Sequence, residues 1–545
     1  MSPELADLTG PTGMVETILL MMAVLAAVAV AAKRLAVPPS VLLVIAGLGI
    51  ALVPGLPNIE LPPELILLIF LPPLIYSAGV AMSWREFRFN LRPITLLAFG
   101  CVIFTTCAIA AAAHYLLHFS WGVGFLLGAI ISPPDVVAPL AVAQKLGLPR
   151  RIVVVLEGEG LANDATALVL YRFAVIAVST GTFSLGTAAG EFALIVIGEI
   201  IYGIGVGWLS LRLRQWAREP RVEITLSLMT PYLAFWVPAH LGGSGVLATV
   251  ACGLYVSWNG PRLIPYATRL QGIFFWDLVV YLIEGMVFLI TGLQVRTLAV
   301  HAHDLSIRDL VIATLLTTAI AIVARFVWVF PATYVPRWMN PKLRKRDPSP
   351  SWQTVFFLSF TAIRGVDSLA VALAIPYTVA SGAAFPQRDT ILFVTFGVII
   401  ITLIGQGSVL GKVAHWLGLL RESKKERALE VKAELLARAA ALEEVTKRLD
   451  KAIKNHELPA NIVRHLRTRN AAREQILPKN LEDGLEEVRQ TAKVKKELID
   501  AERDFIYQLL RDGRITDEAR RRIEYELDLE EASVANRALD GGGWI

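Results

Sequence analysis

Carboxylate and amide side chains lie inside otherwise apolar stretches of this chain. The densest group is the run Glu-Gly-Glu-Gly-Leu-Ala-Asn-Asp at residues 157–164. On a helix, Glu159 and Asn163 are four residues apart and share a face, whereas Asp164 is rotated by about 140° from Glu159. Several acids with few bases predict a cation site. Because no His or Cys joins them, the oxygen ligands favour a hard monovalent cation or a proton over a transition metal.

Two further apolar stretches are interrupted at their midpoints. One contains Ser132-Pro-Pro-Asp135 and the other contains Arg364-Gly-Val-Asp367. Proline removes an amide donor and clashes with the preceding turn, so it breaks or kinks a helix. A packing kink explains either interruption alone. The pair, each with charges beside it, instead indicates an ion site at the membrane midplane, because broken helices present free carbonyls and dipole ends.

Other ionisable residues in the apolar stretches are weaker signals. Pairing with another side chain, or snorkelling to the membrane surface, explains each of them without a role in transport. They are Arg172, Glu191, Glu199, Glu284 and Arg325.

Charge divides the chain into two parts. Of the 545 residues 55% are apolar and 18% charged, and the mean hydropathy is +0.56. Residues 421–545 hold 26 of the 52 Lys and Arg residues and 26 of the 47 Asp and Glu residues. A polytopic membrane domain over residues 1–420, followed by a charged helical tail over 421–545, fits this split and excludes an ordinary soluble enzyme. The net charge of +5 lies in the membrane part, so it does not indicate nucleic-acid binding.

The apolar runs predict thirteen transmembrane helices, because each crossing takes roughly 20 residues. The predicted intervals are 13–32, 37–54, 61–82, 93–116, 119–145, 152–178, 187–211, 222–240, 243–257, 274–295, 309–335, 352–379 and 389–418. Thirteen helices allow two inverted sets of six joined by the seventh, as in many secondary transporters. The fifth and twelfth helices would then correspond, and these two carry the interruptions.

Basic residues in the connecting segments predict the orientation. Segments after odd-numbered helices carry nineteen Lys and Arg residues, whereas those after even-numbered helices carry only Arg296, Arg308 and Arg388. Basic residues accumulate in cytoplasmic loops. We therefore expect the N-terminus outside and the tail in the cytoplasm.

At these motifs the chain resembles the monovalent cation/proton antiporters, the sodium/proton exchangers of bacteria and animals. Residues 157–164 resemble that family's E-G-E-S-L-L-N-D signature. Residues 132–138 resemble its T-D-P-V-A segment, and residues 364–370 resemble its R-G-x-x-S-L-A segment. The resemblance covers about residues 10–420, and the three motifs occur in order on the fifth, sixth and twelfth predicted helices.

The resemblance implies a role for each motif residue. Asp164 would carry a cation and a proton alternately, Asn163 would stabilise it, and Asp135 would lie where the broken helices cross. Glu159 and Arg364 would form a structural ion pair.

Three positions depart from the family pattern, and one acid is added to it. Gly160 replaces a Ser, Pro134 replaces a Thr and offers only its carbonyl, and Val136 replaces a Pro. Asp367 is an acid that the pattern does not require. Ion preference and the number of ligands therefore stay open.

Together these features predict an all-α polytopic transporter, not an enzyme, that exchanges sodium or a similar alkali cation for protons in the bacterial inner membrane. No phosphate-loop motif indicates ATP, and no cofactor is expected. The resemblance implies electroneutral exchange by a homodimer that serves pH homeostasis, with membrane lipids around it. Potassium/proton exchange, a cation channel and a membrane-anchored sensor are the alternatives. No motif identifies a partner for the tail.

Overall fold

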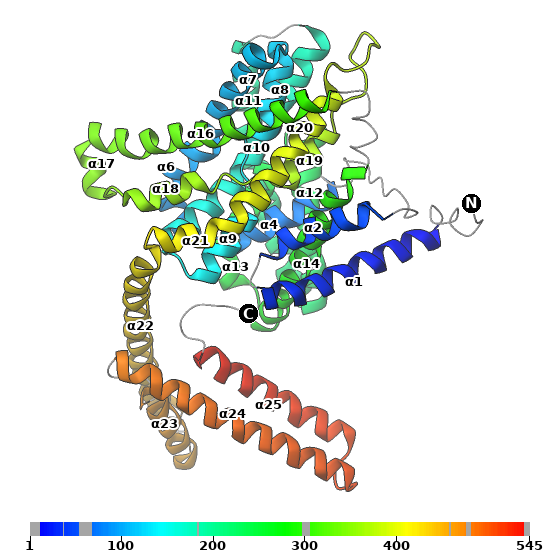
Figure 1. The fold of residues 1–545 in the computed structure, drawn as a ribbon. Coiled ribbons are helices and arrows are strands. Elements are labelled where there is room, and N and C mark those ends of the chain that lie inside the picture. Colours follow the sequence, from blue (N-terminus) through cyan, green and yellow to red (C-terminus); the bar gives the residue numbers. More distant parts are fainter. Residues whose placement is uncertain are drawn as a thin grey trace. The chain divides into compact units, whose positions relative to one another are not determined.

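The computed structural model describes residues 11–35, 38–53, 68–181, 185–296, 306–456, 459–475 and 481–538. Apart from one isolated bridge between Thr378 and Ala384, the regular structure in these residues is helical. The chain divides into two compact units between Leu419 and Leu420. Figure 1 shows the helices in chain order.

Helices and two π-helical segments, η2 and η3, make up the first unit. They are α1 (Pro11–Leu35), α2 (Pro39–Ala51), α4 (Leu71–Ala81), α5 (Trp84–Phe89), α6 (Leu91–Thr95), η2 (Leu96–Cys101), α7 (Val102–Leu117), α8 (Trp121–Ile131), α9 (Val137–Leu146), α10 (Arg150–Thr180), α11 (Leu185–Ala217), α12 (Pro220–His240), α13 (Val246–Leu263), α14 (Tyr266–Leu293), α16 (Ile307–Met339), α17 (Pro341–Arg346), α18 (Trp352–Phe360), α19 (Val366–Leu373), α20 (Arg388–Ile400), η3 (Ile401–Gln406) and α21 (Gly407–Trp416).

Seven of the described helical stretches are long and apolar enough to cross a membrane by length and composition. They start at Ile18, Leu91, Arg150, Ala188, Tyr266, Ile307 and Arg388, and four shorter apolar helices accompany them. Each of the thirteen predicted intervals overlaps a helix or a consecutive set of helices, although residues 61–67 of the third lie outside the described residues. The number of membrane crossings stays a prediction.

One predicted helix is shorter than expected. The interval 352–379 was expected to be helical to its end, but α19 ends at Leu373. The following residues form turns, since Pro376 lacks an amide donor and Gly382 has a left-handed φ of 81°.

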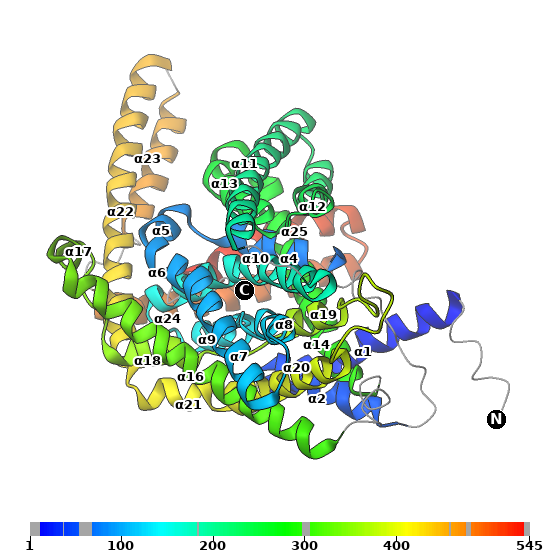
Figure 2. The same cartoon turned by 90° about the horizontal axis from the view of Figure 1, so that it is seen from above.

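The first unit consists of two groups of helices. Helices α1, α2, α4 and α11–α14 pack mainly on one another, as do α6–α9 and α16–α21, and α10 contacts both groups. Figure 2 shows α11, α12 and α13 on the side opposite α16, α18 and α21. One apolar core joins α7, α8, α16, α19 and α20, with Leu127, Ile131 and Ile399 fully buried. This core includes α8 and α19, and so one half of each interrupted stretch.

The second unit consists of α22 (Leu419–His456), α23 (Ala460–Gln475), α24 (Leu481–Arg511) and α25 (Asp517–Ala538). Helices α24 and α25 pair through a small apolar core that includes Ile499 and Leu527. On the surface of this pair, Arg503 of α24 contacts both Asp528 and Glu531 of α25 at 2.7 Å.

Candidate functional site

The chain leaves the helical conformation at both interrupted stretches, and there the two stretches meet. Helix α8 ends at Ile131 and α9 begins at Val137, whereas α18 ends at Phe360 and α19 begins at Val366. The backbone amide of Asp135 donates a hydrogen bond to the carbonyl of Ile363 at 2.8 Å. The crossing is therefore held by the backbone itself.

Gly365 allows this close approach. A Cβ atom at position 365 would overlap the carboxyl group of Asp135. The other carboxylate oxygen of Asp135, Oδ1, accepts a hydrogen bond from the amide of Val137 at 2.8 Å. Asp135 thus binds the amide of the first residue of α9 while its side chain lies against the second interruption.

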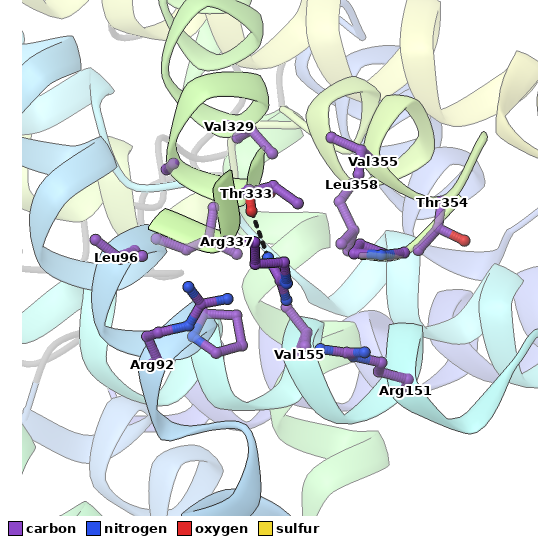
Figure 3. Close-up of a pocket in the computed structure, with 14 residues that line it drawn as sticks. Arg92, Leu96, Arg151, Val155, Val329, Thr333, Arg337, Thr354, Val355 and Leu358 are labelled. Atoms are coloured by element: carbon purple, nitrogen blue, oxygen red, sulfur yellow. Dashed lines mark hydrogen bonds between the residues drawn. The ribbon is translucent and has the colours of Figure 1, made fainter. Parts of the chain in front are cut away.

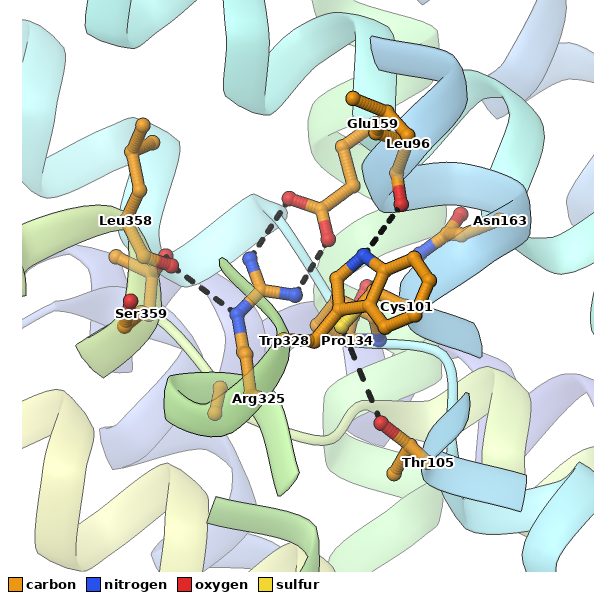
Figure 4. Close-up of polar contacts among 12 residues, drawn as sticks. Leu96, Cys101, Thr105, Pro134, Glu159, Asn163, Arg325, Trp328, Leu358 and Ser359 are labelled. Carbon is orange, nitrogen blue, oxygen red and sulfur yellow. Dashed lines mark hydrogen bonds and ion pairs between the residues drawn. The ribbon is translucent and has the colours of Figure 1, made fainter. Parts of the chain in front are cut away.

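Asn163 joins α10 to the first interruption. Its Nδ2 donates to the carbonyl of Pro134 at 2.7 Å, and its Oδ1 accepts from the amide of Asp164 at 2.8 Å. Figure 4 shows the Asn163 side chain beside Pro134. Asn163 is fully buried and uses both ends of its amide, so its orientation is fixed. The Pro134 carbonyl, which the sequence predicts as an ion ligand, accepts this hydrogen bond.

The expected ion pair between Glu159 and Arg364 is wrong, because Glu159 has a different partner. Glu159 instead pairs with Arg325 of α16, at 2.5 Å and 2.7 Å between the two guanidinium nitrogens and the two carboxylate oxygens. Both side chains are buried, with 0% and 2% exposed. The Nε of Arg325 also donates to the carbonyl of Leu358 at 3.0 Å, as Figure 4 shows. Arg325, a weak signal in the sequence, is therefore the counter-charge of Glu159.

Arg364 takes a different position. Its Nε donates to the carbonyl of Ile131, the last residue of α8, and its Nη1 donates to the carbonyl of Ala362, both at 2.5 Å. Carbonyls at helix ends carry partial negative charge. Arg364 thus places a buried positive charge on backbone carbonyls of both interruptions, where it stabilises the crossing.

Asp164 and Asp367 line a common cavity of about 20 Å³, together with Ala129, Pro133 and Ser368. Neither carboxylate has a hydrogen bond or an ion pair to another described residue. Their charges act on each other, and the charge of Asp135 acts on both. A cavity of this size has room for a water molecule or a small ion.

Glu284 is a further acid within electrostatic reach of Asp135. It lies on α14, and the charge of Asp135 acts on it. The sequence placed it among the weaker signals because no motif surrounds it, and the only signal was an acid within an apolar run. Among the described residues, no group of three His, Cys, Asp or Glu side chains is arranged to hold a metal ion.

Two departures from the expected motifs lie against each other. A Cβ atom at position 160 would overlap the Cγ2 methyl of Val136. Val136 therefore fills the space that a serine at position 160 would occupy, so the two changes compensate sterically.

Comparison with known proteins assigns the family. Residues 20–416 match the family model described as the transmembrane sodium/hydrogen exchanger. This chain belongs to that exchanger family. Its members are transporters rather than enzymes.

Several relatives are similar over most of the chain. An uncharacterized Na⁺/H⁺ exchanger of Mycobacterium bovis is 35% identical over 79% of this chain and 80% of its own length. The Na⁺/H⁺ antiporter ApNhaP of Aphanothece halophytica is 32% identical over 76% of this chain and 75% of its own. A sodium, potassium, lithium and rubidium/H⁺ antiporter of Bacillus pumilus is 33% identical, over 66% of this chain and 55% of its own.

The fold has a solved counterpart. The sodium proton antiporter MjNhaP1 of Methanocaldococcus jannaschii superposes with a TM-score of 0.59 at 19% identity. The match covers 74% of this chain and 98% of that one.

Proposed function

We propose that this exchanger exchanges sodium for protons because both ions compete for one binding site, the Asp164 carboxylate. The observation that carries this proposal is the contrast on α10. Glu159 has a buried counter-charge, whereas the Asp164 carboxylate lines a cavity and has no paired base among the described residues. A buried carboxylate without a paired base is costly, so binding a cation or a proton stabilises it more than it would stabilise a carboxylate that is already paired.

Backbone oxygens at the interruptions supply further ligands in this proposal. Broken helices at the midplane offer carbonyls to a cation. Asn163 holds Asp164 and Pro134 together, and Asp135 adds a carboxylate at the crossing. In this proposal Asp367 keeps one protonation state throughout the cycle and only Asp164 alternates, so one proton exchanges for one sodium ion.

The finer architecture belongs to the same proposal. Thirteen helices would form two inverted repeats, in which α8–α9 and α18–α19 occupy corresponding positions. The basic residues of the connecting segments support an outside N-terminus and a cytoplasmic tail. Alternating access would carry the occupied site between the two faces, and the assembly would be a homodimer in the plasma membrane.

Asp164→Asn tests the mechanism. An amide neither binds a proton reversibly nor neutralises a cation, so exchange in proteoliposomes should fall to background while the melting temperature stays close to wild type. Asp309→Asn is the matched control, since it makes the same chemical change at an exposed position on α16. Substantial exchange by Asp164→Asn would overturn the proposal.

Competition between sodium and protons for one site gives a second, independent test. If one site binds either ion, each tenfold rise in sodium should shift the acid limb of the activity profile by about one pH unit towards acid. An acid limb that stays fixed would show that the proton acts elsewhere.

Potassium is the alternative substrate that a specific observation favours. The Bacillus pumilus relative is named for sodium, potassium, lithium and rubidium. Everted vesicles with a pH probe, titrated with each chloride salt, distinguish the cations. A channel would pass the cation without a coupled proton flux in the same vesicles.

A further inference from the structure

A second polar cluster lies apart from the candidate ion site. Arg92 of α6, Arg151 of α10 and Arg337 of α16, called here the arginine cluster, converge on the carboxylate of Asp347. The nitrogen–oxygen distances are 3.2 Å, 2.6 Å and 2.7 Å respectively. Three guanidinium groups share one carboxylate, so the group carries a net charge of about +2.

The positive charge of this cluster exceeds its negative charge, and some of its buried donors have no acceptor among the described residues. Burial alone would raise the pKa of Asp347, but the hydrogen bond from Arg151 and the three positive charges outweigh it and lower that pKa below its usual range. The Nε and Nη1 groups of Arg92 are buried and have no acceptor among the described residues. Buried donors of a charged group are costly to leave without an acceptor.

A cavity of about 40 Å³ adjoins these groups. Figure 3 shows Arg92, Arg151 and Arg337 around it, with Thr333 and Thr354 also in its wall. Since one water molecule needs about 10–15 Å³ of such space, the cavity has room for a few waters or one small anionic group. A nucleotide base would not fit.

The membrane depth of the cavity follows from nearby tryptophans. Trp338, next to Arg337, is 82% exposed, and Trp352 at the start of α18 is 52% exposed. Exposed tryptophans on membrane helices are typical of the headgroup level. The short helix α17, which precedes Asp347, adds four exposed basic residues, Lys342, Arg344, Lys345 and Arg346.

We propose that the arginine cluster binds a phosphate group, supplied either by an acidic lipid headgroup or by free phosphate. Planar guanidinium groups donate paired hydrogen bonds to phosphate oxygens, and a tetrahedral anion can engage more than one arginine at once. The bound group would provide acceptors for Arg92 and would tie α6, α10 and α16 together. Binding is measured without an ion gradient, so the proposal stands or falls independently of the exchange mechanism.

The test uses the purified, delipidated full-length protein and its melting temperature. Inorganic phosphate is compared with chloride at equal ionic strength. In a second arm, micelles containing phosphatidylglycerol are compared with micelles containing diacylglycerol of the same acyl chains. Stabilisation by inorganic phosphate identifies a free-phosphate site, and stabilisation by phosphatidylglycerol alone identifies a lipid site.

Variants separate binding from surface attraction. Arg92→Gln and Arg151→Gln should each weaken the apparent affinity roughly tenfold or more, because each removes a charge-assisted hydrogen bond. Arg88→Gln, at an exposed position on the neighbouring α5, should respond as wild type. Arg151, with a third of its side chain exposed, keeps the test valid if Arg92→Gln does not fold.

Asp347→Asn distinguishes an anion site from a purely structural cluster. Loss of the carboxylate raises the net charge of the site, so this variant should melt at a lower temperature without phosphate and yet bind phosphate more tightly. The proposal is overturned if neither phosphate source stabilises the wild type. It is also overturned if Arg92→Gln and Arg151→Gln respond as wild type, or if Asp347→Asn loses the response.

Discussion

Two of the carboxylates on helix α10, five residues apart, are in opposite situations. Glu159 is fully buried and bound at both oxygens by Arg325, whereas Asp164 lines a cavity next to a second acid, Asp367. A buried carboxylate with a well-placed guanidinium gains little from a further cation. The comparison teaches that the counter-charge, and not the depth in the membrane, separates a structural acid from an acid available to ions.

The largest expected effect comes from removing that counter-charge. Arg325→Gln leaves Glu159 buried without its base, so we expect a loss of about 3–5 kcal/mol in stability. The double variant Glu159→Gln/Arg325→Gln should recover part of that loss. Thermal unfolding of the single and double variants measures the coupling.

Arg364 provides the control for this pair. Arg364→Gln should also destabilise the protein, because it strips the cation from the carbonyls of Ile131 and Ala362. Adding Glu159→Gln should not rescue it. A rescue would restore the pairing that the sequence motifs imply and contradict the structural one.

The second prediction concerns Asp367, the neighbour that Asp164 has in place of a base. If Asp164 is the only carboxylate that alternates between a bound sodium ion and a bound proton, each turnover moves no net charge. Proteoliposomes clamped at 0 and at 100 mV should then reach the same proton gradient, although one charge would be worth about 2.3 kcal/mol at 100 mV. An endpoint that depends on the potential in wild type, and not in Asp367→Asn, would show two working carboxylates.

A third prediction tests the wall beside Asp164. Gly160→Ser should cost about 1–3 kcal/mol in stability, because its Cβ overlaps Val136. The double variant Val136→Ala/Gly160→Ser should be more stable than Gly160→Ser alone. Gly49→Ser on α2, where nothing lies near the added Cβ, is the control for helix propensity, and melting temperatures decide the outcome.

The smallest effect is expected at Asp347, an acid with three bases. Its pKa is lowered in the folded protein, so its contribution to stability is present above the ordinary carboxyl pKa and is lost as the pH falls through the lowered value. Asp347→Asn should melt below wild type by a constant interval from about pH 8 to about pH 5. The interval should shrink only below about pH 4. An interval that closes near neutral pH would contradict the assignment.

Sequence reasoning singled out most of the polar residues that meet at the two interruptions, but it did not predict which residues they contact. Asp135, Asn163 and Asp164 stand out because polar groups in apolar runs are costly, and the two interruptions stand out because Pro and Gly disrupt helices. Arg325, the partner of Glu159, did not stand out, because it is 166 residues away on a helix without a motif. Pairing in three dimensions depends on which helix faces pack together, and the apolar runs leave that undetermined.

The hydrogen bonds at the crossing have a consequence for timescales. The link from Asp135 to Ile363, the link from Asn163 to Pro134 and the contacts of Arg364 all leave the Asp164 carboxylate uninvolved. A change of load at Asp164 therefore breaks none of them. Loading should be as fast as ion dehydration and side-chain rotation allow, whereas collective helix motions, in the microsecond to millisecond range, would limit turnover.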